Sequence, residues 1–115
     1  MTGKTGEDIA TALLISKGFE ILANNYKKFC GEIDIIAKKE NLVAFVEVKY
    51  RKDLSMGYPR EAVDLKKQNR VRDAAAFFIS EKSLEIPTFS EYDFRFDVIE
   101  IIGSIMEISH IENAF

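Results

Sequence analysis

The sequence predicts a mixed α/β domain in which a mixed sheet is flanked by helices, in the order αβββαββ. Two observations predict this class. Runs with the alternating apolar pattern of strands occupy residues 19–50 and 92–111. Two stretches with apolar residues three and four apart, typical of amphipathic helices, precede and interrupt those runs. The 115 residues correspond by length to one domain, residues 1–115.

The first half of the chain predicts one helix and three strands. A helix is expected over about residues 6–17, and Gly18 ends it. Its buried stripe consists of Ile9, Ala10, Leu13 and Leu14. Strands are expected over residues 19–27, 31–38 and 42–50, with a tight turn near Glu40 and Asn41 joining the last two.

The second half predicts a loop, a helix and two more strands. Gly57 and Pro59 indicate a loop over residues 51–59. The helix expected over about residues 60–81 has an apolar stripe formed by Val63, Val71, Ala74, Ala75 and Phe78, and Lys67 lies in line with it. Strands are expected at 92–101 and 105–111, with Gly103 in the turn between them.

Composition limits the class of protein. The apolar fraction is 47% and the charged fraction 30%, typical of a globular domain. Cys30 is the only cysteine, which excludes an internal disulfide and fits a reducing compartment. No run approaches the roughly 18 apolar residues of a membrane span, and the first residues lack an apolar signal core. We therefore expect a cytoplasmic protein with no membrane partner.

The charge distribution is uneven. The net charge of the whole chain is −3, which by itself disfavours a nucleic-acid partner. Residues 49–72, however, contain eight basic and three acidic residues, a net charge of +5. Such a window indicates either a solvated helix face or a surface for phosphates.

The predicted hairpin of residues 31–50 concentrates charges on one face. Side chains alternate between the faces of a strand, so Glu32, Asp34 and Ile36 share a face. By the same alternation one face of the next strand holds Phe45, Glu47, Lys49 and Arg51. A two-residue turn sets Ile36 opposite Phe45, Asp34 opposite Glu47, and Glu32 opposite Lys49. A slip of one residue would move these groups apart.

Opposed carboxylates repel, which leaves two interpretations of the hairpin. A divalent cation would remove the repulsion, and Mg²⁺ commonly takes one or two carboxylates together with water and phosphate oxygens. Alternatively, the face is a salt-bridged, solvent-exposed side of an amphipathic hairpin. Glu7 either interacts with the helix dipole or supplies a third carboxylate. Lys67 either extends to solvent or reaches the acidic face.

The motifs resemble a known superfamily. An Asp on one strand followed by Glu-x-Lys on the next, here "IDII" and "VEVK", resembles the PD-(D/E)xK nucleases, which have a restriction-endonuclease-like fold. More closely, the chain resembles the YraN family of small bacterial proteins, which are similar to archaeal Holliday-junction resolvases. The matching stretches are "GKTGEDIA", "NNYKKFCGEIDIIAK", "LVAFVEVKYR", "GYPREAVDLKKQNRVRDAA" and "RFDVIEI". Ile33 stands where the superfamily's nominal proline would precede Asp34.

The resemblance implies roles for individual residues. Asp34, Glu47 and Glu7 are implied ligands of Mg²⁺ or Mn²⁺ and, together with Lys49, the catalytic residues. Lys49 is expected to position the attacking water or to stabilise the charge on the phosphorane. Arg51 and Lys67 match basic positions that would contact the phosphate backbone or support the site. Lys66 and Arg70 belong to the basic window of residues 49–72, and we expect them to contact the nucleic acid as well. Glu32 belongs to the family's "GEID" pattern without an implied role.

The function implied is metal-dependent hydrolysis of phosphodiester bonds in branched or structured DNA. A homodimer is expected by analogy, because a junction contains two symmetric cleavage sites. Two alternatives remain open at this level. One is a nucleic-acid-binding module that keeps the fold without cleaving. The other is a structural or interaction protein whose acidic face is only solvated.

Overall fold

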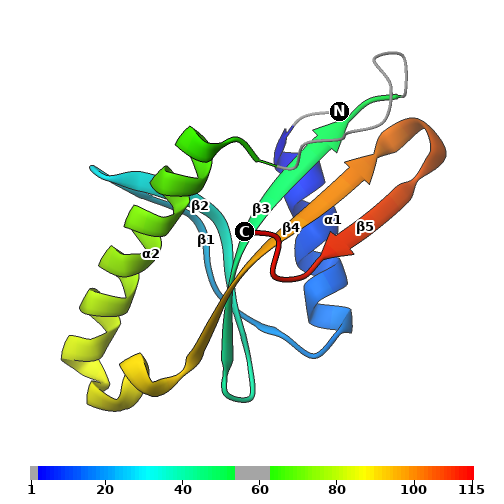
Figure 1. Cartoon of the computed structure of the whole chain (residues 1–115). Helices are drawn as coiled ribbons and strands as arrows, with labels where there is room; N and C mark the ends of the chain where they lie inside the picture. Colours follow the sequence, from blue (N-terminus) through cyan, green and yellow to red (C-terminus); the bar gives the residue numbers. More distant parts are fainter. Residues whose placement is uncertain (1–2, 54–62) are drawn as a thin grey trace.

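The computed structural model describes residues 3–53 and 63–115, and this part of the chain forms one mixed sheet (Figure 1). Its strands are β1 (Glu20–Lys28), β2 (Gly31–Lys39), β3 (Leu42–Arg51), β4 (Asp93–Ile102) and β5 (Glu107–Ile111). They lie side by side in the order β1-β2-β3-β4-β5. Only β3 and β4 pair in parallel, and the other neighbours are antiparallel.

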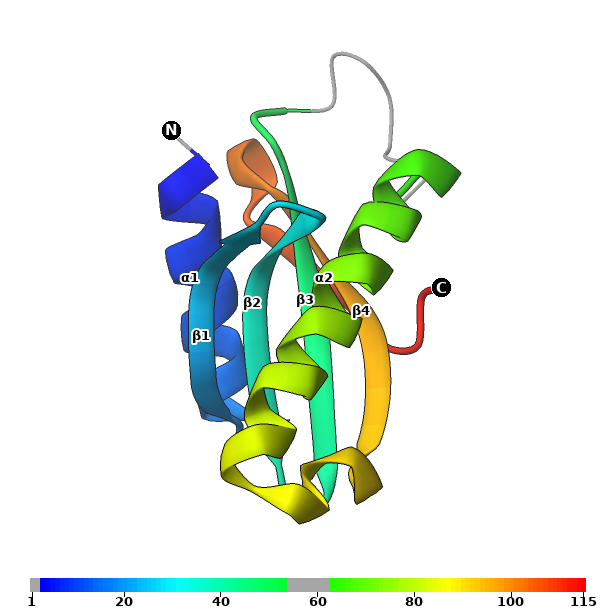
Figure 2. The ribbon, with the colours of Figure 1, turned by 90° about the vertical axis from the view of Figure 1, so that its left-hand side faces the viewer.

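Two helices cover opposite faces of the sheet (Figures 1 and 2). They are α1 (Gly3–Ser16) and α2 (Leu65–Glu85). The parallel pairing of β3 and β4 requires a crossover connection, which contains α2. Short 3₁₀ turns, η1 (Pro87–Glu91) and η2 (Gly103–Ile105), flank β4. No helix in the described ranges is both long and apolar enough to cross a membrane.

Each helix packs on its own apolar core. On the α1 face, Ala10 and Leu14 contact Ile35, Val46 and Ile99 of the sheet. On the α2 face, the core combines aliphatic and aromatic side chains, and the buried members are Ile33, Ile36, Val43, Phe45, Val71, Ala74, Ala75, Phe78 and Phe89. The structure therefore confirms the expected mixed sheet flanked by helices.

Helix α2 begins later than the sequence analysis expected. It starts at Leu65 rather than near residue 60, because Asp64 is extended and its Oδ1 accepts the backbone N–H of Lys67 at 2.8 Å. This N-cap defines the first turn. Val63 is buried but precedes the helix, which continues to Glu85 instead of ending near residue 81. The expected loop, with Gly57 and Pro59, and the helix start at Arg60 fall outside the described residues.

The last strand is also shorter than expected. It begins at Glu107 and not at residue 105, because Ile105 ends η2 and Met106 adopts a left-handed conformation with φ 47°. A residue in that conformation cannot continue the extended ladder. The shortened strand still pairs along β4, with Ile99 opposite His110 and Ile101 opposite Ile108.

The β2–β3 hairpin confirms the predicted turn but not the whole register. Lys39 pairs with Leu42 and Ile36 with Phe45, as expected from a two-residue turn in which Glu40 has φ 54°. The ladder then ends at Ile35 and Val46. The pairings expected beyond it, Asp34 with Glu47 and Glu32 with Lys49, were wrong, because the two strands separate there.

The separation of β2 from β3 coincides with a close contact between β2 and α2. The backbone of Gly31 touches α2 so closely that a Cβ atom built on it would lie 2.0 Å from the carbonyl oxygen of Arg70. The start of β2 is therefore drawn toward α2. Accordingly, Ile33 packs in the α2 core, whereas Ile35 packs in the α1 core. The strict alternation expected for these two residues fails between them.

We expect Gly31→Ala to lower the free energy of unfolding by about 1–3 kcal/mol, the usual effect of adding a methylene group where there is no space. The group it meets is helix backbone, which cannot rotate away as a side chain could. Urea unfolding followed by circular dichroism measures the change. Gly6→Ala is the control, since its Cβ would lie 3.3 Å from a Tyr50 side-chain atom and alanine favours the helix. Equal stability of Gly31→Ala and wild type would contradict the close packing.

Candidate active site

Asp34 lies where β2 and β3 separate. Its Oδ2 accepts a hydrogen bond at 2.8 Å from the backbone N–H of Val48 on β3. The carboxylate thus takes the place that a strand backbone would have filled in a continued ladder. Asp34 is half-buried and held between the two strands by this bond. Its carboxyl group lies beside that of Glu47, as expected from the sequence, although the backbone ladder ends before this pair.

Glu47 is the buried acid of the site. Its exposed fraction is 7%, and Asp97 is the only other acidic residue that is buried in the described residues. Glu47 Oε2 lies 3.1 Å from Lys67 Nζ. Glu47 Oε1 is buried without a hydrogen-bond partner. An unsatisfied oxygen of a buried carboxyl group is costly and indicates a place for a ligand or ion.

The surroundings of Glu47 disfavour its charged form. Burial raises the pKa of its carboxyl group, and the neighbouring Asp34 raises it further. The Lys67 ammonium acts in the opposite direction but does not cancel these effects. A strongly raised carboxyl pKa caused by burial and a second carboxylate is characteristic of functional sites. The interpretation of the hairpin's acidic face as only salt-bridged and solvent-exposed therefore does not fit Glu47.

Lys67 extends from α2 to the acids, which is one of the two orientations that the sequence left open. Its Nζ lies 3.1 Å from Glu47 and 3.7 Å from Glu32. Burial lowers the pKa of the Lys67 amine, but Glu47, Asp34 and Glu32 outweigh this and raise it. Glu32 is also 4.0 Å from Lys27. The structure thus places Glu32, for which the sequence implied no role, beside Lys67.

Glu7 approaches from α1 on the other face of the sheet. Burial raises the pKa of its carboxyl group, Asp34 raises it further, and a hydrogen bond with the Asn25 side chain lowers it. Asn25, on β1, has φ 52°, which is uncommon for a residue other than glycine. Sequence reasoning missed Asn25. The available signal was an asparagine pair inside a strand pattern, since asparagine tolerates this conformation.

The predicted basic residues lie around these acids on two elements. Lys49 and Arg51 are half-buried on β3, two and four residues beyond Glu47. Lys66, Lys67 and Arg70 line a cavity of about 250 Å³ at the start of α2, together with Glu32 and Asp64. Arg51 does not line this cavity. The α2 cations therefore adjoin the acidic site through Lys67, whereas Arg51 lies near the end of its strand.

The donor set fits a hard divalent cation. The carboxylate oxygens of Asp34 and Glu47 are the ligand type that Mg²⁺ prefers, and Glu47 Oε1 has no partner within the protein. In residues 3–53 and 63–115, no group of three or more His, Cys, Asp or Glu side chains is positioned to hold a metal ion as it stands. Two carboxylates suffice in number for Mg²⁺, which keeps several waters. Glu7 lies near Asp34 without completing such a group.

We expect Lys67→Met to lower the free energy of unfolding by about 1–3 kcal/mol, because the buried Glu47 loses its charged hydrogen-bond partner. The loss of stability caused by Lys67→Met should be smaller in a protein that already carries Glu47→Gln, since the glutamine needs no counter-charge. A double-mutant cycle of urea unfolding measures this coupling. Lys66→Met, at an exposed position in the same helix turn, is the matched control. Additive effects of the two changes would contradict the ion pair.

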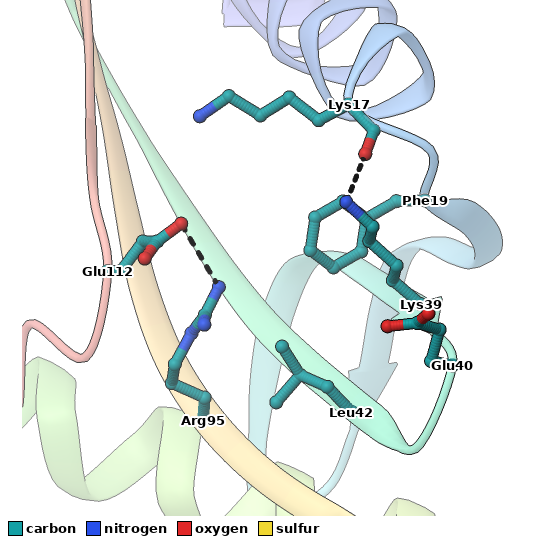
Figure 3. Close-up of a pocket in the computed structure, with 7 residues that line it drawn as sticks. All are labelled: Lys17, Phe19, Lys39, Glu40, Leu42, Arg95 and Glu112. Carbon is teal, nitrogen blue, oxygen red and sulfur yellow. Dashed lines mark hydrogen bonds and ion pairs between the residues drawn. The ribbon is translucent and has the colours of Figure 1, made fainter.

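A second cavity, of about 520 Å³, lies between α1 and the hairpin turn (Figure 3). Lys17, Lys39 and Arg95 line it together with Phe19, Glu40, Leu42 and Glu112. Each of its three cations already binds a group of the protein. Lys17 Nζ is 2.7 Å from His110 Nδ1, Lys39 Nζ donates to the carbonyl oxygen of Lys17, and Arg95 Nη2 is 3.7 Å from Glu112. This cavity is separate from Asp34 and Glu47.

Asp97, a partner of the cavity residue Arg95, joins the C-terminal residues to the sheet. Its carboxylate accepts from Arg95 Nε and Nη2 at 2.8 and 2.9 Å and from the Asn113 N–H at 3.0 Å. His110 Nε2 lies 2.9 Å from Asp97 Oδ2. Arg95 therefore pairs with Asp97 through two parallel hydrogen bonds. The C-terminal residues make a second contact with the sheet, because the ring of Phe115 stacks on that of Phe96 with 5.3 Å between the ring centroids.

Together these features define the class of the protein. A mixed five-stranded sheet with a helix on each face is consistent with the restriction-endonuclease-like fold that the motifs implied. The acidic side chains lie where two central strands separate, and cations from α2 adjoin them.

Comparison with known proteins identifies the family. The profile described as "Uncharacterised protein family UPF0102" matches residues 6–101, so the chain belongs to this family, which is the YraN family. The chain is 41% identical to a UPF0102 protein of Dictyoglomus turgidum over 98% of its own length and 95% of that protein. It is 46% identical to one from Alkaliphilus metalliredigens, covering 98% and 96% of the two chains. It is 48% identical to one from Chloroherpeton thalassium over 87% of its own length and 74% of that protein.

Proposed function

We propose that this protein is a divalent-metal-dependent endonuclease that hydrolyses phosphodiester bonds in branched or otherwise structured DNA. The observation that carries the proposal is the buried Glu47 beside Asp34, with one carboxylate oxygen unpartnered and a raised carboxyl pKa. Burying a carboxyl group in this way destabilises a protein, so it calls for an explanation in terms of function. The surrounding lysines and the nuclease-like fold support the same conclusion.

Asp34 and Glu47, with Glu7 beside Asp34, are the residues that would hold Mg²⁺ or Mn²⁺. When bound, such an ion polarises a phosphate and lowers the pKa of bound water. The chain's own contribution is to fix the carboxylates in advance. Asp34 is held by the Val48 N–H, and Glu47 is buried on a central strand, so little reorganisation is needed.

The lysines of the site supply fixed positive charge. Lys49 follows Glu47 by two residues on β3, so the two side chains leave the strand on the same face. We assign it to the phosphate undergoing hydrolysis, where it positions the attacking water or stabilises the added negative charge. Lys67 already interacts with Glu47 and Glu32. Its positive charge partly neutralises the carboxylates before the substrate binds. Lys67 also lies at the edge of the basic surface.

The basic residues Arg51, Lys66, Lys67 and Arg70 are proposed to contact the DNA backbone. Contacts of this kind give affinity without sequence information. If all four bind phosphates, the logarithm of the affinity falls with the logarithm of salt concentration with a slope of roughly −3 to −4. A homodimer is part of the proposal, because a four-way junction contains two symmetric cleavage sites. Analytical ultracentrifugation with and without a junction tests that part.

A second candidate function is a nucleic-acid-binding module that does not cleave. It is favoured by one observation: Lys67 lies against Glu47, and no three acidic, His or Cys side chains of the described residues are positioned around an ion. In this version the basic cavity beside α2 is the functional surface. It predicts salt-dependent DNA binding that Asp34→Asn leaves intact, together with no cleavage in any metal.

The experiment that separates the two functions is a cleavage assay on a labelled panel of four-way junction, flap, duplex and single strand. Each substrate is incubated with wild-type protein in Mg²⁺ and in Mn²⁺, beside a binding titration of the same DNA. Cleavage of at least one substrate supports the nuclease. Binding without cleavage supports the module, and absence of both contradicts each of them.

A further inference from the structure

We propose that the turn between β1 and β2 is a base-stacking contact, in which Phe29 stacks on an unpaired nucleobase of branched DNA. The flanking Lys27 and Lys28 contact the adjoining phosphates. The inference rests on the proposed function for its choice of DNA as the partner. It adds a binding site outside the acids and assigns the selectivity for branched substrates to a particular side chain.

The exposure of Phe29 is the first observation. Its exposed fraction is 89%, the highest among the large apolar residues of the described chain. It follows Lys28, whose pairing with Gly31 is the last rung of the β1–β2 ladder. An aromatic ring left in water at the tip of a hairpin does nothing for the core, and aromatic rings are the side chains on which unpaired bases stack.

The tip is held in place rather than loosely attached. Gly31 touches the carbonyl oxygen of Arg70 on α2, and the Phe29 ring meets Phe77 of α2 edge-on at 5.5 Å between ring centroids. Figure 1 shows the same turn (cyan) extending beyond the sheet beside α2. The ring is therefore oriented in advance, which lowers the entropic cost of stacking a base on it.

The charges around the tip complement a nucleic-acid backbone. Lys27 and Lys28 directly precede Phe29. The side chain of Lys27 is 71% exposed, and Lys28 Nζ lies 5.7 Å from the centroid of the Phe77 ring that Phe29 contacts. The neighbouring carboxylates are Glu32, 4.0 Å from Lys27, and Glu81, 3.6 Å from Lys28. Lys66 and Arg70 of α2 extend the basic surface from this turn toward the acidic site. An aromatic ring among lysines is the composition of single-strand-binding surfaces.

The distance to the acids fits one continuous DNA strand. Phe29 precedes Asp34 by five residues, which spans at most about 16 Å along a strand at 3.3 Å per residue. A stacked nucleic-acid strand rises about 3.4 Å per nucleotide, so the stacked base would lie at most about five nucleotides from the phosphate at the acids. Bases inside an intact duplex have no free face. An overhang presents the faces of unpaired bases, and an open branch point presents the faces of the base pairs at its centre, which would give selectivity without reading sequence.

The chain provides its own fluorescent test, because it contains no tryptophan. Phe29→Trp creates a single tryptophan at the tip, and stacking on a base quenches its emission. Leu84→Trp is the matched control, since Leu84 is 88% exposed near the end of α2. We expect a four-way junction and an overhang to quench Trp fluorescence in Phe29→Trp and not in Leu84→Trp. A blunt duplex should quench neither.

Affinity supplies the second readout. Phe29→Ala should weaken binding of the junction about 5- to 100-fold, the usual range for losing one stacked base, and change duplex binding less than about twofold. Phe29→Tyr keeps an aromatic face and should retain affinity, whereas Phe29→Leu keeps apolar volume and should lose it. Leu84→Ala should bind both DNAs as wild type does. Circular dichroism confirms that each variant remains folded.

The outcomes separate this inference from the proposed function. Wild-type binding or cleavage of the junction, with no quenching and no loss in Phe29→Ala, overturns the stacking contact and leaves the nuclease in place. Equal losses for junction and duplex also overturn it, because an unpaired base would then not be what Phe29 meets. If wild-type protein binds no DNA at low salt, the proposed function fails and the stacking contact fails with it.

Discussion

If the proposed nuclease function is correct, we expect Asp34→Asn and Glu47→Gln each to lower cleavage of a four-way junction in Mg²⁺ by at least about 100-fold, the usual effect of removing one transition-state donor. Each change removes a negative charge where a cation is expected, without removing the side-chain volume. Glu47→Gln also neutralises a carboxyl group that is only 7% exposed, so it should not unfold the domain. The rate of junction cleavage under single-turnover conditions measures the effect.

Three further measurements make this prediction specific. Glu107→Gln, an exposed residue at the start of β5, should cleave as wild type does. Junction binding should be retained or tightened in both site variants, because a charge that repels phosphate has been removed. Calorimetric titration with Mn²⁺ should show weaker metal binding. A variant that cleaves at the wild-type rate would exclude its residue from the site.

Asp97→Ala lowers the free energy of unfolding by about 3–5 kcal/mol, the usual consequence of removing one partner of a buried ion pair. Asp97 is fully buried, and its carboxylate binds Arg95, His110 and the backbone of Asn113. Without it, the Arg95 guanidinium keeps only the more distant Glu112. Urea unfolding measures the loss. Asp93→Ala, at an exposed position of the same strand, is the control and should change stability by less than about 0.5 kcal/mol.

The same carboxylate makes stability depend on acid pH. Burial alone would raise the pKa of Asp97, but the hydrogen bonds from His110, Arg95 and Asn113 outweigh it and lower the pKa to about 2, from an ordinary value of 3.8. A group with a depressed pKa stabilises the folded state above its unfolded pKa and loses that effect as the pH falls through its folded pKa. Between about pH 4 and 2 wild type should therefore lose more stability than Asp97→Asn. Parallel loss in the two proteins would contradict this assignment.

Several parts of the site could be predicted because they depend on local pattern alone. The two-residue turn fixed the pairing of Ile36 with Phe45, and alternation placed Glu47 on the face that meets α2. Helical spacing placed Lys67 in line with the buried side of its helix, and its amine does reach the acids. The tight turn and the helical spacing involve residues close in sequence, so their geometry follows from backbone periodicity.

Other parts depended on contacts that no local pattern contains. The register predicted Asp34 opposite Glu47, but the strands separate, and Asp34 binds the Val48 N–H instead. The close contact of Gly31 with α2, some 40 residues away in sequence, accompanies that separation and moves Ile33 to the other core. The hydrogen bond between Asn25 and Glu7 could not be predicted, because it forms only when α1 packs on the sheet.

The sequence by itself determined the class of fold, the family, and the acids and cations from which a site would be built. These follow from side-chain identity, from periodicity, and from spacing over a few residues. Only the tertiary structure decided how those groups are used: that Glu47 is buried with an unpartnered oxygen, that Lys67 lies against it, and that Asp97 binds the end of the chain. The physical reason is that burial and ion pairing depend on how the helices dock on the twisted sheet, which brings together residues distant in sequence.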